Sequence, residues 1–258
     1  MKTKKNQKIK FACFAILILS LFLSTQACKK KENSEPDNQT GTGAVPMPFY
    51  PNPSDADAVL IAVKSSVPSP VQIPGMSMGI TIDFGMGIAV FKGNTKADKV
   101  SLNNTELTFT NGVHTWLPNF KNALDPTALT GINLDGDITW NVTNPTIQKT
   151  LSSLPGKPEV LSGKTITKSE GYVISNRLAS GAQHVLYAIH ANNKTVMKTL
   201  SGNSTSCTFT AAELAELGTT KNAIVQANAY RISDEMIGGK KVYFVRQSSY
   251  SVTSVEIN

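Results

Sequence analysis

AIVQANAYRISDEMIGGKKVYFVRQSSYSVTSVEI, residues 223–257, is the stretch of the chain that decides its fold. Its two arms, 223–232 and 241–257, are rich in β-branched and aromatic residues and repeat with the period of two that is typical of strands. Gly238 and Gly239 lie between the arms, and glycine readily adopts the positive φ that a tight hairpin turn requires. The stretch therefore predicts one long β-hairpin at the end of the chain.

Four shorter runs with strand character precede this hairpin. They are residues 172–175, 185–191, 195–200 and 206–209, and Asn192-Asn193 forms a turn signal between the middle two. About seven strands at this spacing are typical of a β-sandwich. In architecture alone, residues 156–258 resemble an immunoglobulin-like or fibronectin-III-like domain, although the Cys…Trp…Cys signature is missing. The resemblance implies an Ig-like sandwich and no particular function.

One helix signal interrupts these strands. Thr210 is a typical N-cap, and Glu213, three residues later, completes a capping box. Phe209 and Leu214 occupy the two positions of a hydrophobic staple, and Gly218 marks the end. We expect a helix of about two turns.

The earlier part of the body, residues 46–155, is also built from short strand-like runs. We expect strands at 59–63, 79–82, 88–91, 100–102, 105–110, 113–117 and 138–142. Asn111-Gly112 is the strongest short hairpin signal in the chain. Glycines at 75, 79, 85 and 87 indicate tight turns or bulges.

The segment 145–163 contains three prolines and few apolar residues after Leu151, which predicts a domain boundary. The predicted fold class is therefore all-β, with antiparallel β-sandwiches and one short helix. It comprises an N-terminal β domain, 46–155, and a C-terminal Ig-like domain, 156–258.

The first 27 residues have the order of a secretory signal peptide. Five lysines precede the apolar run 11–23, and small residues, Thr25 and Ala27, follow it. An apolar run of thirteen residues is too short to cross a membrane, which takes about 20 residues. We therefore predict that residues 1–27 are removed on export.

Residues 23–28 resemble the processing site of bacterial lipoproteins, in particular those of Bacteroidetes type. The resemblance implies that the Cys28 thiol carries diacylglycerol and that Cys28 is the new N-terminus. Lys29, rather than aspartate, follows it, which favours the outer membrane. Residues 28–45 are polar and predict a flexible tether between the anchor and the body. The alternative is simple secretion, with Cys28 an ordinary residue.

The net charge of +7 comes mainly from the signal segment. Five of the 25 lysines and arginines lie in residues 1–27, which contain no acid, so the remaining chain carries 20 basic against 18 acidic side chains. A nearly neutral body disfavours nucleic acid as a partner, because nucleic-acid binding needs a dense basic face.

The three cysteines do not predict a disulfide framework. Cys13 leaves with the signal segment and Cys28 is used by the lipid, so Cys207 has no partner within the chain. We expect Cys207 to be a small buried hydrophobic residue. Without lipidation, a Cys28–Cys207 bridge becomes the alternative.

Residues 75–79, GMSMG, match the G-x-S-x-G string of serine hydrolases, with Ser77 as the nucleophile. That string needs a strand-to-helix elbow, whereas a strand-like run follows it here. A turn is therefore the preferred interpretation, and a hydrolase that combines Ser77 with a downstream histidine is an alternative.

The sequence NLDGD, residues 133–137, has the alternating oxygen ligands of a calcium loop in Asp135 and Asp137. The twelfth position holds Asn144 instead of glutamate, so a structural turn is preferred and a divalent-metal module is an alternative. His184 and His190 do not form a metal pair, because a strand through both separates them by about 20 Å.

His114 and Trp116 lie beside the Asn111-Gly112 turn. They are candidates for a shallow sugar-binding surface, although packing against a sheet face is the preferred interpretation. No catalytic constellation or cofactor motif accompanies them. We therefore expect a non-enzymatic, membrane-anchored envelope lipoprotein without a cofactor, which binds a protein or a glycan or serves structurally.

Overall fold

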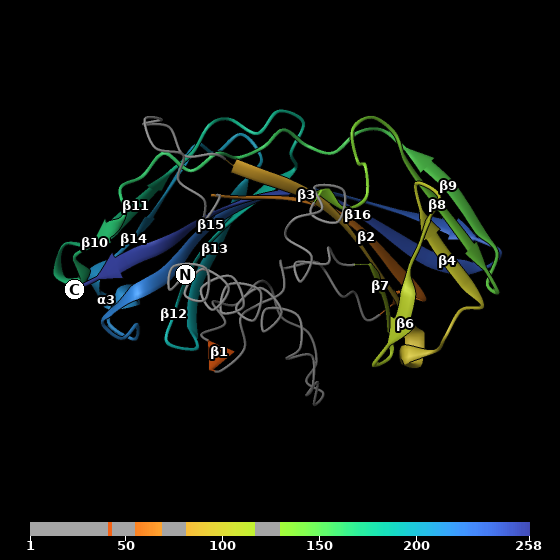
Figure 1. Ribbon diagram of the computed structural model, residues 1–258, viewed down its shortest axis with the longest axis horizontal. Coiled ribbons are helices and arrows are strands. Elements are labelled where there is room, and N and C mark those ends of the chain that lie inside the picture. The colour runs from red at the N-terminus through yellow and green to blue at the C-terminus, as the bar shows by residue number, and fades with distance from the viewer. Residues whose placement is uncertain (1–40, 43–54, 69–80, 117–129) are drawn as a thin grey trace, which may run out of the picture.

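The computed structural model describes residues 41–42, 55–68, 81–116 and 130–258. These residues form an all-β structure with one short α-helix, so the predicted fold class is confirmed (Figure 1). One large curved sheet carries two small sheets near its opposite ends.

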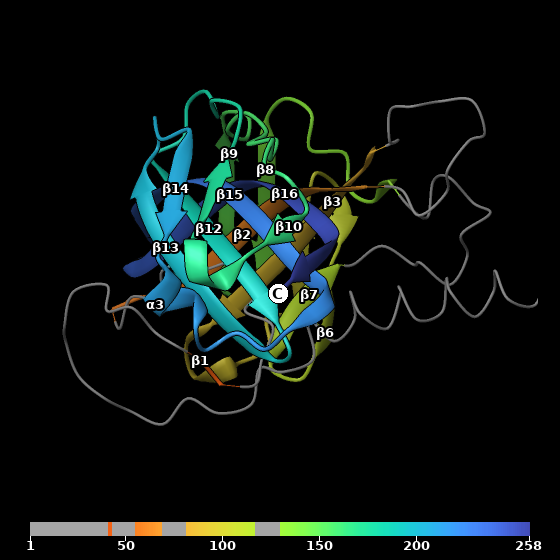
Figure 2. The same cartoon turned by 90° about the vertical axis from the view of Figure 1, so that its left-hand side faces the viewer.

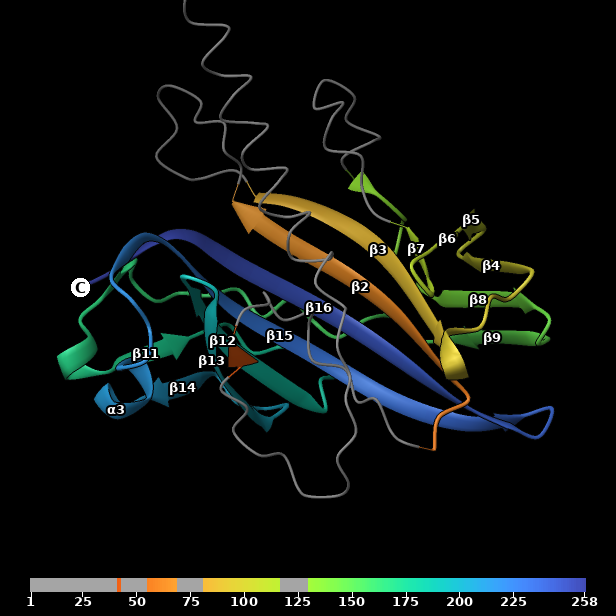
Figure 3. The same ribbon diagram turned by 90° about the horizontal axis from the view of Figure 1, so that it is seen from below.

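The large sheet has ten strands. In spatial order nine of them are β1 (Gly41–Thr42), β13 (Lys194–Ser201), β12 (His184–Ala191), β15 (Thr220–Ile237), β16 (Lys240–Ile257), β2 (Ala58–Pro68), β3 (Thr81–Phe91), β7 (Val113–Trp116) and β6 (Thr108–Thr110). The tenth, β10 (Thr165–Ile166), pairs with β16. Pairing is antiparallel except where β16 meets β2 and β10. Figure 3 shows β15, β16, β2 and β3 running side by side.

The predicted C-terminal hairpin is the longest element of the sheet. β15 and β16 have 18 residues each and pair along their length, and Gly238 and Gly239 form the turn at positive φ. Asn111-Gly112 and Asn192-Asn193 also lie at positive φ between paired strands, so these two hairpin predictions are confirmed. The three turns share the backbone geometry that asparagine and glycine adopt at least cost.

Two small sheets cover one face of the large sheet, which we call the lid face. One contains β5 (Thr105–Glu106), β4 (Lys99–Leu102), β8 (Ile138–Thr143) and β9 (Ile147–Leu151); the other contains β11 (Tyr172–Ser175) and β14 (Ser206–Phe209). Figure 2 shows the second of these beside β12 and β13. Between each small sheet and the large one lies a separate hydrophobic core.

The N-terminal core includes Leu60, Leu102 and Trp140, and the C-terminal core includes Tyr187 and Phe209. All five side chains are fully buried or nearly so. Burying large side chains in this way is the main stabilising contribution to each half.

Two predicted strands are one strand in the structure. Residues 79–82 and 88–91 were expected to be separate, with glycines in a turn, but β3 runs from Thr81 to Phe91 through Gly85 and Gly87. A Cβ on Gly85 would lie 1.9 Å from the carbonyl oxygen of Ile132. Gly85 lets the segment around Ile132 approach the sheet closely, and the prediction of a turn or bulge is wrong for Gly85 and Gly87, which pair regularly with β2.

Several other elements also differ from prediction, among them β1 and β10, which were not expected. The run 105–110 is divided into β5 and β6 because Leu107 turns into the N-terminal core. The strand β9 was not predicted. The helix α3 (Ala211–Leu214) has the expected capping box but is shorter than two turns. Two short 3-10 segments, η1 (Lys92–Asn94) and η3 (Lys168–Glu170), complete the elements of the described residues.

The sheet is continuous across the predicted boundary at residue 155. β16 pairs with β2 in parallel, from Val242 opposite Ala58 to Tyr250 opposite Ser66. The two cores nevertheless divide near that boundary, except that Val242 and Phe244 of β16 belong to the N-terminal core. The two halves thus have separate cores and a shared sheet.

Most of the predicted export and anchoring segments, including Cys28, lie outside the described residues. Within the predicted tether, β1 pairs with β13 at Lys194 and Thr195. Among the helices of the described ranges, none is long and apolar enough to cross a membrane.

Candidate functional site

The lid face is polar between the two cores. Along β16 the side chains on this face run from Phe244 in the N-terminal core, through Arg246 and Ser248, to Tyr250 at the C-terminal core. Alternation in a strand places these four side chains on one face. The change from apolar to polar and back divides one sheet face into two cores and a polar band.

The neighbouring strands continue the band. Lys64 and Ser66 follow Leu60 and Ala62 on the lid face of β2, and Asp83 lies opposite Ser66 on β3. The Ser66 hydroxyl donates to Asp83 Oδ1 at 2.6 Å. The band therefore crosses three adjacent strands.

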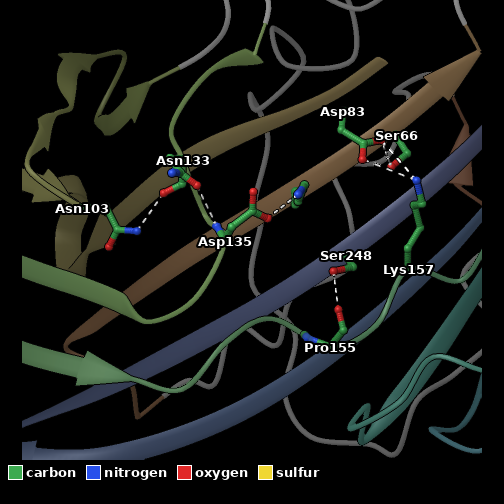
Figure 4. A network of polar contacts seen from close by, with 9 residues as sticks. Ser66, Asp83, Asn103, Asn133, Asp135, Pro155, Lys157 and Ser248 are labelled. Atoms are coloured by element: carbon green, nitrogen blue, oxygen red, sulfur yellow. Dashed lines mark hydrogen bonds and ion pairs between the residues drawn. The ribbon is translucent and has the colours of Figure 1, made fainter. Parts of the chain in front are cut away.

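The segment 152–157, which joins the two halves, crosses over this band. Arg246 Nη1 donates to the carbonyl oxygen of Ser152 at 3.0 Å, and Ser248 Oγ donates to that of Pro155 at 2.6 Å. Lys157 Nζ lies 3.4 Å from Asp83 Oδ1 (Figure 4). Three successive contacts thus attach this segment, which we call the linker, to β16 and β3.

A cleft of about 290 Å³ opens beside the linker. It is lined by Lys64, Ser66, Asp83, Leu134, Asp135, Gly136, Ser153, Leu154, Pro155, Lys157 and Ser248. Lys64 Nζ and Asp135 Oδ1 are 2.6 Å apart, with 31% and 76% of the two side chains exposed. Solvent therefore reaches the charged groups of the cleft.

The charges of the cleft balance. Two lysine ammonium groups face two carboxylates, in the pairs Lys64–Asp135 and Lys157–Asp83. Serine hydroxyls add groups that can both donate and accept hydrogen bonds. Such a lining suits a neutral ligand with many hydroxyl groups better than a highly charged one.

The loop that carries Asp135 is built by asparagines. Asn103 Nδ2 donates to the carbonyl oxygens of Asn133 and Asp137, at 2.8 and 3.2 Å, and its Oδ1 accepts from the Thr139 N–H at 2.7 Å. Asn133 Oδ1 accepts from the Asp135 N–H (Figure 4). The backbone oxygens of Asn133 and Asp137 and the Asn133 side-chain oxygen thus already accept hydrogen bonds from the protein itself. This favours a structural turn over the calcium alternative.

The described residues contain no group of three or more histidine, cysteine, aspartate or glutamate side chains that could hold a metal ion. β12 runs through both His184 and His190, which is the condition on which they are excluded as a pair of metal ligands. His184 stacks on Tyr230 with ring centroids 5.2 Å apart. His190 is buried and contacts Thr195 and Gln226.

His114 packs in the interior, as the preferred interpretation expects, so its candidacy for a sugar-binding surface fails. Its side chain is 2% exposed, and Nε2 accepts from the Ala97 N–H at 3.1 Å. Phe91 and Phe109 contact the ring, and burial lowers the pKa of His114, so the imidazole is a neutral acceptor in the interior. Trp116 is half-buried and packs against the N-terminal core.

Cys207 is buried, as expected, and has no disulfide partner among the described residues; burial raises the pKa of its thiol to about 11. Such a thiol is inert at neutral pH. Ser77 and Cys28 lie outside the described residues.

Sequence reasoning missed the polar band, apart from Asp135. A signal was present: Lys64, Arg246 and Ser248 occupy inward positions in apolar strands, where the period of two predicts apolar side chains. Neither a protein-family model nor a curated protein matches the chain.

Proposed function

We propose that this protein is a non-enzymatic envelope module that is anchored by a lipid on Cys28 and binds a glycan in the cleft beside the linker. The anchoring part rests on the order of residues 1–28, with a basic flank, a short apolar run and a cysteine after small residues. Two or more acyl chains make an anchor stable. The outer membrane is the proposed location.

The cleft is the observation that carries the binding part. Its volume of about 290 Å³ is near the lower limit of ligand pockets and suits one or two sugar rings. Paired charges and serine hydroxyls match the mixed donors and acceptors of a sugar. Leu134, Leu154 and Pro155 supply apolar contact for its C–H faces.

The anchor is tested with Cys28→Ala. We expect the variant to leave the membrane fraction or to accumulate as an unprocessed precursor, and to lose incorporation of labelled palmitate. The wild-type protein should incorporate the label. A wild-type protein that is fully soluble after secretion contradicts the anchor.

The cleft is tested by titrating the purified full-length protein with a panel of neutral oligosaccharides in a calorimeter. We expect at least one to bind, and Lys64→Gln and Asp135→Asn each to weaken it about tenfold, the typical effect of losing one hydrogen bond to a charged group. Asp234→Asn, which removes an exposed carboxylate on β15 outside the cleft lining, is the matched control. Equal oligosaccharide affinities in the wild type and the three variants would exclude the cleft as the binding site.

A further inference from the structure

Two arginines face each other on the lid face of the β15–β16 hairpin. Arg231 and Arg246 are directly opposite in the antiparallel register. Side chains in such pairs have Cβ atoms about 5 Å apart, and like charges there repel each other. The pair lies on the polar band, because Arg246 contacts Ser152 of the linker.

The two guanidinium groups lack a negative partner. Arg246 is 6% exposed, and no ion pair reaches it or Arg231 within the part of the chain that the structure describes. Nη1 of Arg246 is satisfied by Ser152, but the buried Nε atoms of both arginines find no hydrogen-bond partner among the described residues. Burial and the nearby Arg231 lower the pKa of Arg246. A buried cation is costly unless it is paired.

A third unsatisfied group lies next to them. Ser233 Oγ, two residues from Arg231 on the same face of β15, is buried and has no partner in the ranges that the structure describes. On the other side, Arg231 Nη1 lies 3.9 Å from where a Cβ on Gly181 would be, so the turn at Gly181 bounds the patch. Ser152 bounds it from the linker.

The charge balance of the band gives the sign of the missing partner. The band, the linker and the cleft together hold four cations, Arg231, Arg246, Lys64 and Lys157, and two carboxylates, Asp83 and Asp135. Both carboxylates pair with lysines. The surplus of two positive charges is therefore located at the arginines.

We propose that Arg231, Arg246 and Ser233 form a binding site for an oxyanion, the carboxylate, phosphate or sulfate group of a ligand. Guanidinium groups present planar N–H donors that match such oxygens. An anion between the two side chains would accept from both free Nε–H groups and from the hydroxyl, and would remove the repulsion. The site does not depend on glycan binding in the cleft, since it uses none of the residues that line that cleft.

The test titrates the purified full-length protein with inorganic phosphate, sulfate and acetate in separate experiments, at constant ionic strength in chloride. We expect saturable binding of at least one anion in the millimolar range or below, together with a rise in melting temperature. The tightest of the three identifies the group, with acetate representing carboxylates. Low concentrations avoid the general stabilisation that concentrated sulfate and phosphate give.

The variants are Arg246→Gln and Arg231→Gln. Each substitution should lower the affinity for the anion at least tenfold, because a hydrogen bond to a charged group is lost. Lys92→Gln removes the same charge from an exposed side chain and should bind as the wild type does. If Arg246→Gln does not fold, Arg231→Gln decides, because Arg231 is half-buried and donates no hydrogen bond to the linker. Absence of saturable binding, or equal affinity in the arginine and Lys92 variants, overturns the site.

Discussion

The two cores on the lid face are similar in size but differ in where their strands come from. The C-terminal core is built by segments that are all within residues 160–257. The N-terminal core combines residues 58–147 with Val242 and Phe244 from the far end of the chain. The C-terminal core is thus formed by one continuous part of the sequence. The N-terminal core also needs residues of the β15–β16 hairpin, which contributes to both cores.

The two halves also differ in how far apart in the sequence their contacting residues lie. In the C-terminal half, His190 pairs with Thr195 across a hairpin. In the N-terminal half, the backbone N–H of Lys241 donates to Asp57 Oδ2, which is 184 residues away. Long-range contacts cost more chain entropy to form, so the N-terminal half should be the more easily separated of the two.

The largest effects should come from removing a large aromatic side chain from either core. We expect Phe209→Ala and Phe244→Ala each to cost about 3–5 kcal/mol of unfolding free energy, because both side chains are fully buried. Phe209→Ala should lower the stability of the whole molecule. Phe244→Ala should release the N-terminal half first, which hydrogen exchange detects as loss of protection in β4 and β8 while β12 and β13 stay protected. Equal loss in both halves of the Phe244 variant would contradict the asymmetry.

Gly85→Ala should be nearly as damaging and confined at first to the N-terminal half. The new Cβ would meet the backbone oxygen of Ile132 at 1.9 Å, and backbone cannot move aside as a flexible side chain can. We expect a loss of about 3 kcal/mol in urea unfolding. The control is Gly238→Ala, at positive φ with nothing near it, for which about 1 kcal/mol is expected. A Gly85 variant as stable as the Gly238 variant would show that the close approach is unimportant.

Each half buries one histidine, and their pKa values should make stability depend on pH. Burial lowers the pKa of His190 to about 4, and burial also lowers that of His114. An unfolded imidazole titrates near 6.5, so the unfolded state binds a proton first as pH falls. Stability is therefore retained above about pH 6.5 and lost as pH falls toward 4.

Between pH 7 and pH 5 the His190 contribution should be a loss of about 2 kcal/mol, measured by urea unfolding at each pH. His190→Gln should show a smaller dependence on pH, with the remainder due mainly to His114. A dependence that is unchanged in His190→Gln would mean that His190 has the same pKa in the folded and unfolded states.

The smallest effects should come from the linker that joins the halves. Lys157→Ala removes an exposed ion pair with Asp83 and should cost less than about 1 kcal/mol. Ser248→Ala removes a buried hydrogen bond to the Pro155 carbonyl and should cost about 1–2 kcal/mol. Thermal melts of both variants compare the two losses of stability. A larger loss in Lys157→Ala than in Ser248→Ala would mean that the ion pair, rather than the buried hydrogen bond, attaches the linker.

Local patterns predicted the C-terminal half well. The strands at 172–175 and 206–209 have the predicted bounds, and the turns at Asn192-Asn193 and Gly238-Gly239 have the expected positive φ. Strand period, turn residues and the capping box are properties of neighbouring residues, so the sequence shows them directly.

What the sequence did not reveal depends on contacts between distant residues. Gly85 was assigned to a turn because nothing in its neighbourhood indicates that Ile132 approaches it. His114 could be kept as a surface candidate because its burial comes from Phe91, Ala97 and Phe109 together. The arginine pair could have been found, since Arg231 and Arg246 are equally far from the Gly238-Gly239 turn and must face each other in any regular hairpin.

The parallel pairing of β2 with β16 has a consequence for the order of events during synthesis. Ala58 pairs with Val242, so β2 leaves the ribosome long before its partner exists. At about 5–20 residues per second, the delay is roughly ten to forty seconds. During that time β2 has an unpaired edge. The large sheet cannot be completed until β16, which ends at Ile257, has been synthesised. The large sheet therefore stays incomplete until translation is almost finished.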